Sequence, residues 1–217
     1  MPRTGILRCA LRAVGFGLVL LLQCMPVSAA PDPVFEPISA AVHQSDQAEF
    51  AQVERVQLHF NRLKRVTDAR LWGQDDYWAT PSELLRAGGG DCEDIAAAKY
   101  FTLRELGVPA DRLRLVYARV YDAVRRRIEP HVVLWYRPAR NRDWLVLDSL
   151  RDPLDGLAQR TDLLSWLTFN ESQVARWSAQ GEERVLGGVE LLSPWNTLLA
   201  RQRALDSVAL VLSMHTL

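Results

Sequence analysis

The sequence has no excess of charge of either sign. Its 26 lysines and arginines balance 26 aspartates and glutamates, so the formal net charge is zero. A balanced charge gives no electrostatic reason to bind nucleic acid or an anionic membrane surface, and we expect neither as a partner. The sequence also lacks internal repeats, the Gly-Lys-Ser/Thr of a P-loop and the histidine and cysteine spacing of a zinc site.

No apolar run near the N-terminus is long enough to span a bilayer, which takes about 20 residues. The apolar run from Ala13 to Leu22 follows three arginines and precedes Val27-Ser28-Ala29, which resembles a cleavage site. This order is typical of a secretory signal peptide over residues 1–29, and we favour it over a membrane anchor. We expect residues 30–217 to form a single domain, with no stable membrane insertion once the signal is removed.

Cysteine is scarce, and signal cleavage would leave one. Cys9 and Cys24 lie within the signal, and Gln23 is too large for the residue that precedes a lipidated cysteine. Exported proteins normally pair their cysteines, but Cys92 alone has no intramolecular partner. Cys92 is therefore either an inert core residue or a reactive thiol.

A run of three glycines, followed by Asp91, precedes Cys92. The glycines at 88–90 precede four residues, Asp91 to Asp94, and apolar residues then recur at helical spacing as far as Leu106. Asp91 is a favourable N-cap, and Asp94 would complete an acidic capping box. The sequence thus predicts Cys92 in the first turn of a buried helix, where the helix dipole favours the thiolate.

The rest of the chain predicts helices before Cys92 and strands after it, the pattern of an α+β protein. Tyr77 and Trp78 either pack over the core or line a cleft beside Cys92. The expected elements are a helix over 47–66, a short helix capped by Thr80, strands over 113–121, 130–136 and 144–148, a loop over 153–158, short helices over 162–169 and 198–205, and an apolar segment over 208–212 docked on the core.

Cys92, His131 and Asp148 follow one another in an order that can bring them together. His131 begins one predicted strand and Asp148 ends the next, so a hairpin of these strands would place imidazole and carboxylate side by side. Packing the Cys92 helix against that sheet would complete a nucleophile, a base and an orienting acid. Each residue also has an ordinary structural explanation, as a core thiol, a strand residue or a turn residue.

The acidic residues around Cys92 oppose thiolate formation, because like charges raise a pKa. A bound cation would remove this conflict, and carboxylate oxygens suit Ca²⁺. Residues three apart at a helix start share one corner, which makes Asp91 and Asp94 the natural pair and Glu93 the weaker ligand. Plain helix capping, which needs no metal, is the alternative.

Several short motifs in this region, taken together, resemble those of a known family. Gly-Gly-Asp-Cys-Glu-Asp runs into Ala-Lys-Tyr-Phe-Thr-Leu-Arg-Glu-Leu-Gly-Val-Pro, and His-Val-Val-Leu and Leu-Val-Leu-Asp follow. Between Tyr77 and Leu150 the chain resembles the bacterial transglutaminase-like cysteine proteinases. The resemblance implies a papain- and transglutaminase-like fold in which the nucleophile's helix packs against an antiparallel sheet. It also implies that Cys92, His131 and Asp148 are catalytic and that Asp91, Glu93 and Asp94 hold a calcium ion needed for activity.

The same resemblance implies a biological setting. The enzyme would be periplasmic and would cleave the N-terminal region of a large surface adhesin at a di-alanine site, so that biofilm cells detach. Its inhibitory partner would be the periplasmic domain of an inner-membrane receptor for cyclic di-GMP. Two alternatives remain open from the residues alone: a transglutaminase that transfers the acyl group to an amine, and a non-catalytic binding module with the same fold.

Overall fold

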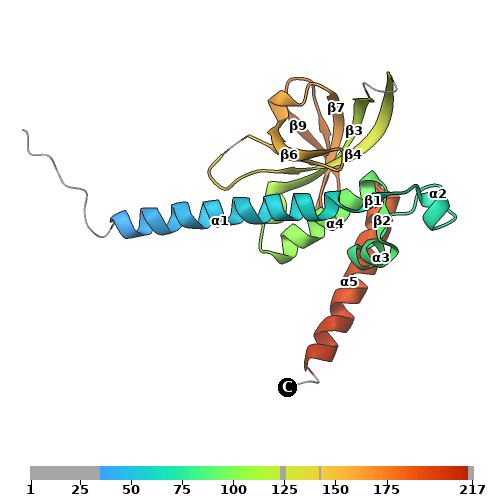
Figure 1. Cartoon of the computed structure of the whole chain (residues 1–217), viewed down its shortest axis with the longest axis horizontal. Helices are drawn as coiled ribbons and strands as arrows, with labels where there is room; N and C mark the ends of the chain where they lie inside the picture. The colour runs from blue at the N-terminus through green and yellow to red at the C-terminus, as the bar shows by residue number, and fades with distance from the viewer. Residues whose placement is uncertain (1–34, 123–125, 142, 215–217) are drawn as a thin grey trace, which may run out of the picture.

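A seven-stranded antiparallel sheet packs on helix α4 (Cys92–Glu105), and α1 (Phe35–Asn61) packs in turn on α4 (Figure 1). The computed structural model describes residues 35–122, 126–141 and 143–214. The signal peptide predicted over 1–29 lies outside these residues, and the division of the chain at residue 30 stays a prediction. None of the helices within the described ranges combines the length and apolar character needed to cross a membrane.

The sheet is continuous, and its strand order is β6-β5-β4-β3-β7-β8-β9. Every neighbouring pair in it is antiparallel. The remaining elements, in chain order, are β1 (Lys64–Arg65), α2 (Asp68–Leu71), α3 (Pro81–Ala87), β2 (Gly89–Gly90), β3 (Leu113–Asp122), β4 (Arg127–Tyr136), β5 (Leu145–Asp148), β6 (Arg151–Gly156), β7 (Leu163–Phe169), β8 (Val174–Trp177), β9 (Glu183–Gly187) and α5 (Ser193–Met214), with short 3₁₀ helices at Ala110–Arg112, Leu157–Gln159 and Val189–Leu191.

The predicted α+β class is confirmed, as are the strands expected over 113–121, 130–136 and 144–148, which are β3, β4 and β5. Two of the elements expected after β5 are wrong. In place of the helix expected over 162–169, residues Leu163–Phe169 form β7, whose backbone pairs with β3 and whose side chains partly alternate in burial. Residues 153–158, expected to be a loop, lie mostly in β6, which pairs with β5.

Helix boundaries also differ from the prediction. Helix α1 begins at Phe35, and it ends at Asn61, earlier than expected, because Lys64 and Arg65 are extended in β1. Helix α5 includes residues 198–205 as predicted, but its far end projects away from the rest of the protein (Figure 1). Val208, the first residue of the apolar segment expected over 208–212 to dock on the core, is 59% exposed and does not dock there, while the side chains of 209–212 lie outside the described residues.

Helix α4 is buried on several sides because it carries small side chains where its neighbours approach. Ala96, Ala97 and Ala98 are each at most 3% exposed. Alanine removes little space and has a high helix propensity, so the helix can contact the sheet and α1 at short distance. Of the larger residues of α4, Tyr100 packs edge to face against Trp195 of α5 and Phe101 stacks on the same ring.

Glycine permits a close approach of two backbones just before α4. Strand β1 pairs in parallel with β2, aligning Lys64 with Gly89 and Arg65 with Gly90. A Cβ atom on Gly89 would lie 2.4 Å from the carbonyl oxygen of Lys64. Gly89 is therefore required by the close pairing of β1 with β2, which holds the chain before α2 beside the start of α4.

Replacing Gly89 by alanine tests this approach. The new Cβ would meet backbone, so Gly89→Ala should lower the free energy of unfolding by about 1–3 kcal/mol, measured by urea denaturation. Gly156→Ala is the matched control, because a Cβ there meets only the end of the Gln159 side chain, at 2.6 Å. We expect that control to lose less than about 1 kcal/mol, through one exposed hydrogen bond. Equal losses in both variants would contradict the argument.

Candidate active site

The β4–β5 hairpin places His131 against Asp148. Leu134 pairs with Leu147, so the start of β4 lies near the end of β5. Nε2 of His131 donates to Oδ1 of Asp148 at 2.7 Å, and both side chains are buried. The contact expected from the hairpin is thus present. Because Nε2 is engaged, Nδ1 is the ring nitrogen that remains for another partner.

Asp148 has a second charged partner. Arg160 donates to its Oδ2 at 2.7 Å and also to both oxygens of Asp162, each at 2.8 Å. The backbone N–H of Leu150 donates to Oδ1 at 2.9 Å. Burial by itself would raise the pKa of Asp148, but hydrogen bonds from His131, Leu150 and Arg160 outweigh it and hold that pKa well below its usual range. Asp148 is therefore ionised at neutral pH.

A buried lysine supports the turn that carries Asp148. Nζ of Lys99 donates to Gln57 at 2.8 Å and to Asn61 at 2.7 Å. The amide of Gln57 donates in turn to the carbonyl oxygens of Asp148 and Arg151, at 2.9 and 2.6 Å. Helices α1 and α4 are therefore tied to the β5–β6 turn through polar contacts. Burial lowers the pKa of Lys99 to about 7, against the opposing influence of the nearby Asp148 carboxylate.

Cys92 is the first residue of α4, as predicted, and lines a pocket of about 530 Å³ together with His131. Its thiol donates to Oε2 of Glu93 at 3.0 Å. Within the part of the chain that the structure describes, no hydrogen bond joins this thiol to His131. Burial, followed by the charges of Glu93 and Asp91, raises the pKa of the Cys92 thiol well above its usual range, while the backbone N–H of Val132 acts in the opposite direction.

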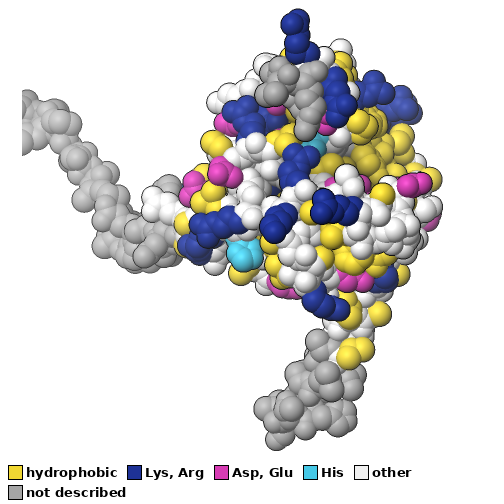
Figure 2. Space-filling view, turned by 45° about the vertical axis from the view of Figure 1, so that its right-hand side comes forward, with side chains coloured by type: hydrophobic (Ala, Val, Ile, Leu, Met, Phe, Trp, Pro, Cys, Tyr) yellow, Lys and Arg dark blue, Asp and Glu magenta, His cyan; other side chains and the backbone are white. Residues whose placement is uncertain are grey.

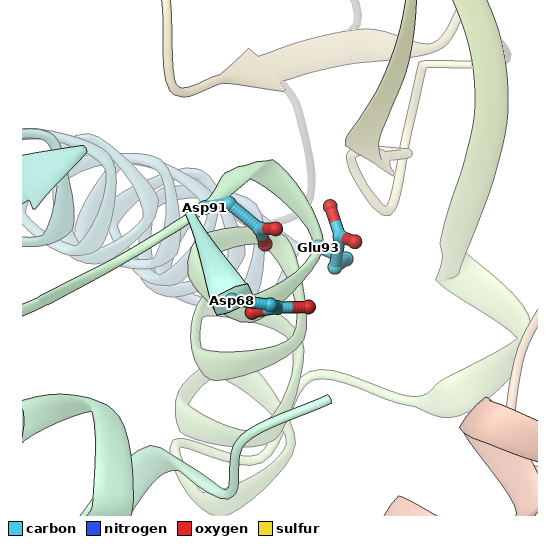
Figure 3. A group of neighbouring side chains, drawn as sticks. All are labelled: Asp68, Asp91 and Glu93. Atoms are coloured by element: carbon cyan, nitrogen blue, oxygen red, sulfur yellow. The ribbon is translucent and has the colours of Figure 1, made fainter. Parts of the chain in front are cut away.

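Three carboxylates meet beside Cys92, but they are not the three that the sequence indicated. Oxygens of Asp68, Asp91 and Glu93 lie within 4.8 Å of one another, and the side chains face a common space (Figure 3). Asp68 begins α2, and it reaches the site because Val66 donates to the carbonyl oxygen of Gly90 at 2.9 Å, next to β1 and β2. No local pattern in the sequence marks Asp68 as part of this group.

Asp94 has a different contact from the one expected. Its Oδ1 accepts a hydrogen bond from the backbone N–H of Ala79 at 2.7 Å, and the side chain is fully buried. The other oxygen of Asp94, Oδ2, is buried without a hydrogen-bond partner, so the expected pairing of Asp91 with Asp94 stays a prediction beside the observed group of Asp68, Asp91 and Glu93. The side chain of Asp91 makes no capping hydrogen bond, so the acidic capping box is wrong. Burial and neighbouring carboxylates raise the pKa of Asp91 to about 9.

The aromatic residues before α3 belong mainly to the core. Trp78 is 3% exposed and packs against Tyr117, Phe169 and Trp195. Tyr77 packs against Trp72 and donates to Glu83 at 3.0 Å. Neither residue lines the pocket of Cys92. Of the two interpretations of this segment, the core one therefore holds.

Comparisons with known proteins find a matching family model and several similar solved structures. A model of the bacterial transglutaminase-like cysteine proteinases matches residues 33–183. Calcium-bound LapG from Legionella pneumophila is 37% identical, with a TM-score of 0.58 over 70% of this chain and 79% of that chain. EGTA-treated LapG from the same organism is 35% identical, with a TM-score of 0.58 over 70% and 77%. Among curated protein sequences, the comparison finds no match.

The buried ion pair of Arg160 with Asp148 yields a stability prediction. Arg160→Met leaves a buried carboxylate without its cation, which should cost about 3–5 kcal/mol of unfolding free energy at pH 7. Because the pKa of Asp148 in the folded protein lies well below its value of about 4 in the unfolded chain, this stability is complete above that value and is lost progressively at lower pH. The difference between the two proteins should therefore shrink as the pH falls below about 4.

Chemical denaturation of both proteins between pH 3 and pH 7 measures this difference. Arg104→Met is the matched control, because the Arg104–Glu171 pair has a similar length, 2.9 Å, but both side chains are about one-third exposed. That control should lose no more than about 1 kcal/mol. A pH-independent loss for Arg160→Met would show that its partner is not the Asp148 carboxylate.

Proposed function

Because the chain belongs to the bacterial transglutaminase-like cysteine proteinase family, we propose that it is a calcium-dependent cysteine endopeptidase of the periplasm. Cys92 is the nucleophile, His131 the general base and Asp148 the residue that orients the imidazole. The observation that carries the proposal is the buried 2.7 Å hydrogen bond from His131 to Asp148, beside a pocket that Cys92 and His131 both line.

The chemistry is acyl transfer through a thioester. Nδ1 of His131 takes the proton of the Cys92 thiol as sulfur attacks the carbonyl carbon of the scissile peptide bond. The imidazolium, held by ionised Asp148, then returns the proton to the leaving amine as the carbon–nitrogen bond breaks. A water molecule, deprotonated by His131, attacks the thioester and releases the acid and the thiol. Backbone N–H groups at the start of α4 are the nearest candidates to stabilise the oxyanion.

The thiol must leave Glu93 before it can react. Its hydrogen bond to that carboxylate and its raised pKa both favour the neutral form. Rotation about the Cα–Cβ bond of Cys92 is the smallest change that frees it, since the thiol already borders the same pocket as the imidazole. Activity therefore requires that Glu93 find another partner.

Asp68, Asp91 and Glu93 suit a calcium ion. One oxygen each of Asp68, Asp91 and Asp94 is buried without a hydrogen-bond partner, and carboxylate oxygens are the donors that calcium prefers. The similarity to calcium-bound LapG adds support. When bound, the ion supplies positive charge that offsets the carboxylates beside Cys92. Asp94, assigned to this site from the family resemblance, bonds Ala79 through Oδ1 and keeps its buried Oδ2 as a further candidate ligand.

The family resemblance also supports a substrate and a regulator. We propose that the enzyme cuts the N-terminal region of a large surface adhesin at a di-alanine site, which releases the adhesin and disperses biofilm cells. The periplasmic domain of an inner-membrane cyclic di-GMP receptor is the proposed inhibitory partner.

Substitution of the three catalytic candidates tests the mechanism. Cys92→Ala should abolish cleavage of an internally quenched peptide with a central Ala-Ala, and His131→Ala should lower kcat/KM by about 10²–10⁴. His59→Ala, which alters an exposed histidine of α1, is the control and should retain wild-type rates. Cleavage by Cys92→Ala at the wild-type rate would exclude the mechanism. A labelled amine added to the same assay would be incorporated if the acyl group went to amines instead of water.

Calcium removal tests the metal site. EGTA should abolish cleavage and lower the Tm, because a ligand that binds only the folded protein stabilises it. Asp68→Asn should weaken calcium binding by at least about tenfold, the equivalent of 1.4 kcal/mol, in calorimetry. Asp75→Asn, at an exposed aspartate in the loop that follows α2, should bind calcium like the wild type. A larger loss of calcium affinity in Asp94→Asn than in Asp68→Asn would favour Asp91, Glu93 and Asp94, the ligands that the family resemblance implies.

A further inference from the structure

The sheet face that α4 covers continues, without cover, past the start of that helix. Leu113 and Leu115 of β3 are fully buried, Tyr117 is half-buried, and Arg119 and Tyr121 are exposed. Residues two apart on a strand share a face, so these five side chains lie in one row along β3, on one face of the sheet. Burial on this face therefore ends beyond Tyr117, close to Cys92 at the start of α4.

Residues on β4 and β7 that pair with Arg119 and Tyr121 are exposed as well. Ile128 of β4 pairs with Tyr121 and is 65% exposed, and Leu164 of β7 pairs with Arg119 and is 66% exposed. Trp166 of β7 is 40% exposed and stacks on Tyr117, with ring centroids 6.2 Å apart and an interplanar angle of 17°. Hydrophobic side chains accordingly gather over the sheet in the upper part of Figure 2. An exposed apolar group of this kind marks a binding surface.

This surface is continuous with the pocket of Cys92. Tyr117 and Ile128 line that pocket together with Cys92 and His131. Tyr117 thus touches both the candidate site and the exposed Trp166. The guanidinium of Arg119 lies 5.9 Å from the Trp166 ring centroid, which holds a polar group at the rim of the apolar area.

We propose that Tyr117, Tyr121, Ile128, Leu164 and Trp166, the apolar platform, bind apolar side chains of the substrate polypeptide on one side of the scissile bond. The proposal rests on the proteinase function proposed above. The occupant is the substrate chain, because a peptide whose carbonyl carbon reaches Cys92 must leave the pocket across the residues that line it. The platform is a sheet face, so recognition there comes from side-chain contact more than from backbone pairing.

Two internally quenched peptides test the platform. Both contain a central Ala-Ala, flanked on both sides by Leu and Phe in one peptide and by Ser and Asn in the other. The wild type with calcium should cleave the apolar peptide with a kcat/KM about tenfold higher, mainly through a lower KM. In Trp166→Ala and in Ile128→Ser, the ratio between the two peptides should fall toward one. The two variants lie on different strands, so a folding defect in one leaves the other informative.

Val185→Ser is the matched control. Val185 is 57% exposed on β9, two strands beyond β7, and should keep the wild-type ratio. Equal rates for the two peptides in the wild type, or an unchanged ratio in both platform variants, would overturn the platform while leaving the proteinase intact. Cleavage of neither peptide would instead overturn the proteinase proposal and the platform with it. A wild-type dimer that Trp166→Ala dissociates in gel filtration would assign the surface to a second copy of the chain.

Discussion

The carboxylate of Asp148 is a fully buried charge, and the surroundings of the candidate site are arranged to satisfy it. His131, Arg160 and the Leu150 N–H occupy its oxygens, while Gln57 holds its backbone carbonyl. A buried ion costs several kcal/mol unless it is paired and hydrogen-bonded, so each of these partners is constrained in turn. The constraint extends outward through Gln57 to Lys99, and it reaches α1, α4 and the sheet.

A second constraint is steric and lies on the other side of Cys92. A Cβ at Gly89 would meet the carbonyl oxygen of Lys64 on the paired strand, and one at Gly90 would meet the side chains of Asp94 and Leu84. This approach delivers Asp68 to the two acids of the helix start and commits Asp94 to the Ala79 N–H. The glycine run therefore determines which carboxylates meet, although it contributes no chemistry of its own.

Local patterns in the sequence predict the features that depend on residues close together in the chain. The start of α4 at Cys92, the Thr80 cap and the β4–β5 hairpin all follow from spacing and turn chemistry, and the hairpin was enough to bring His131 to Asp148. The sequence did not reveal Asp68, Arg160 or Lys99, because each reaches the site through tertiary pairing. The strand β7 was mistaken for a helix, since Leu-Leu-Ser-Trp-Leu-Thr-Phe has an apolar content compatible with either and only its partner β3 decides.

The span of the Asp148 contacts along the chain has a consequence for folding. Gln57 lies 91 residues before Asp148, and Arg160 lies 12 residues after it. Closing long loops costs entropy that is recovered only when the final contacts form, so the contact of Gln57 is expected to arise later than that of Arg160. A chain in which α1 has not yet docked can already hold His131 against Asp148 through the β4–β5 hairpin, but the Asp148 carbonyl then lacks its Gln57 partner. The catalytic pair thus forms through a short hairpin, whereas its support from α1 requires the chain to close a long loop.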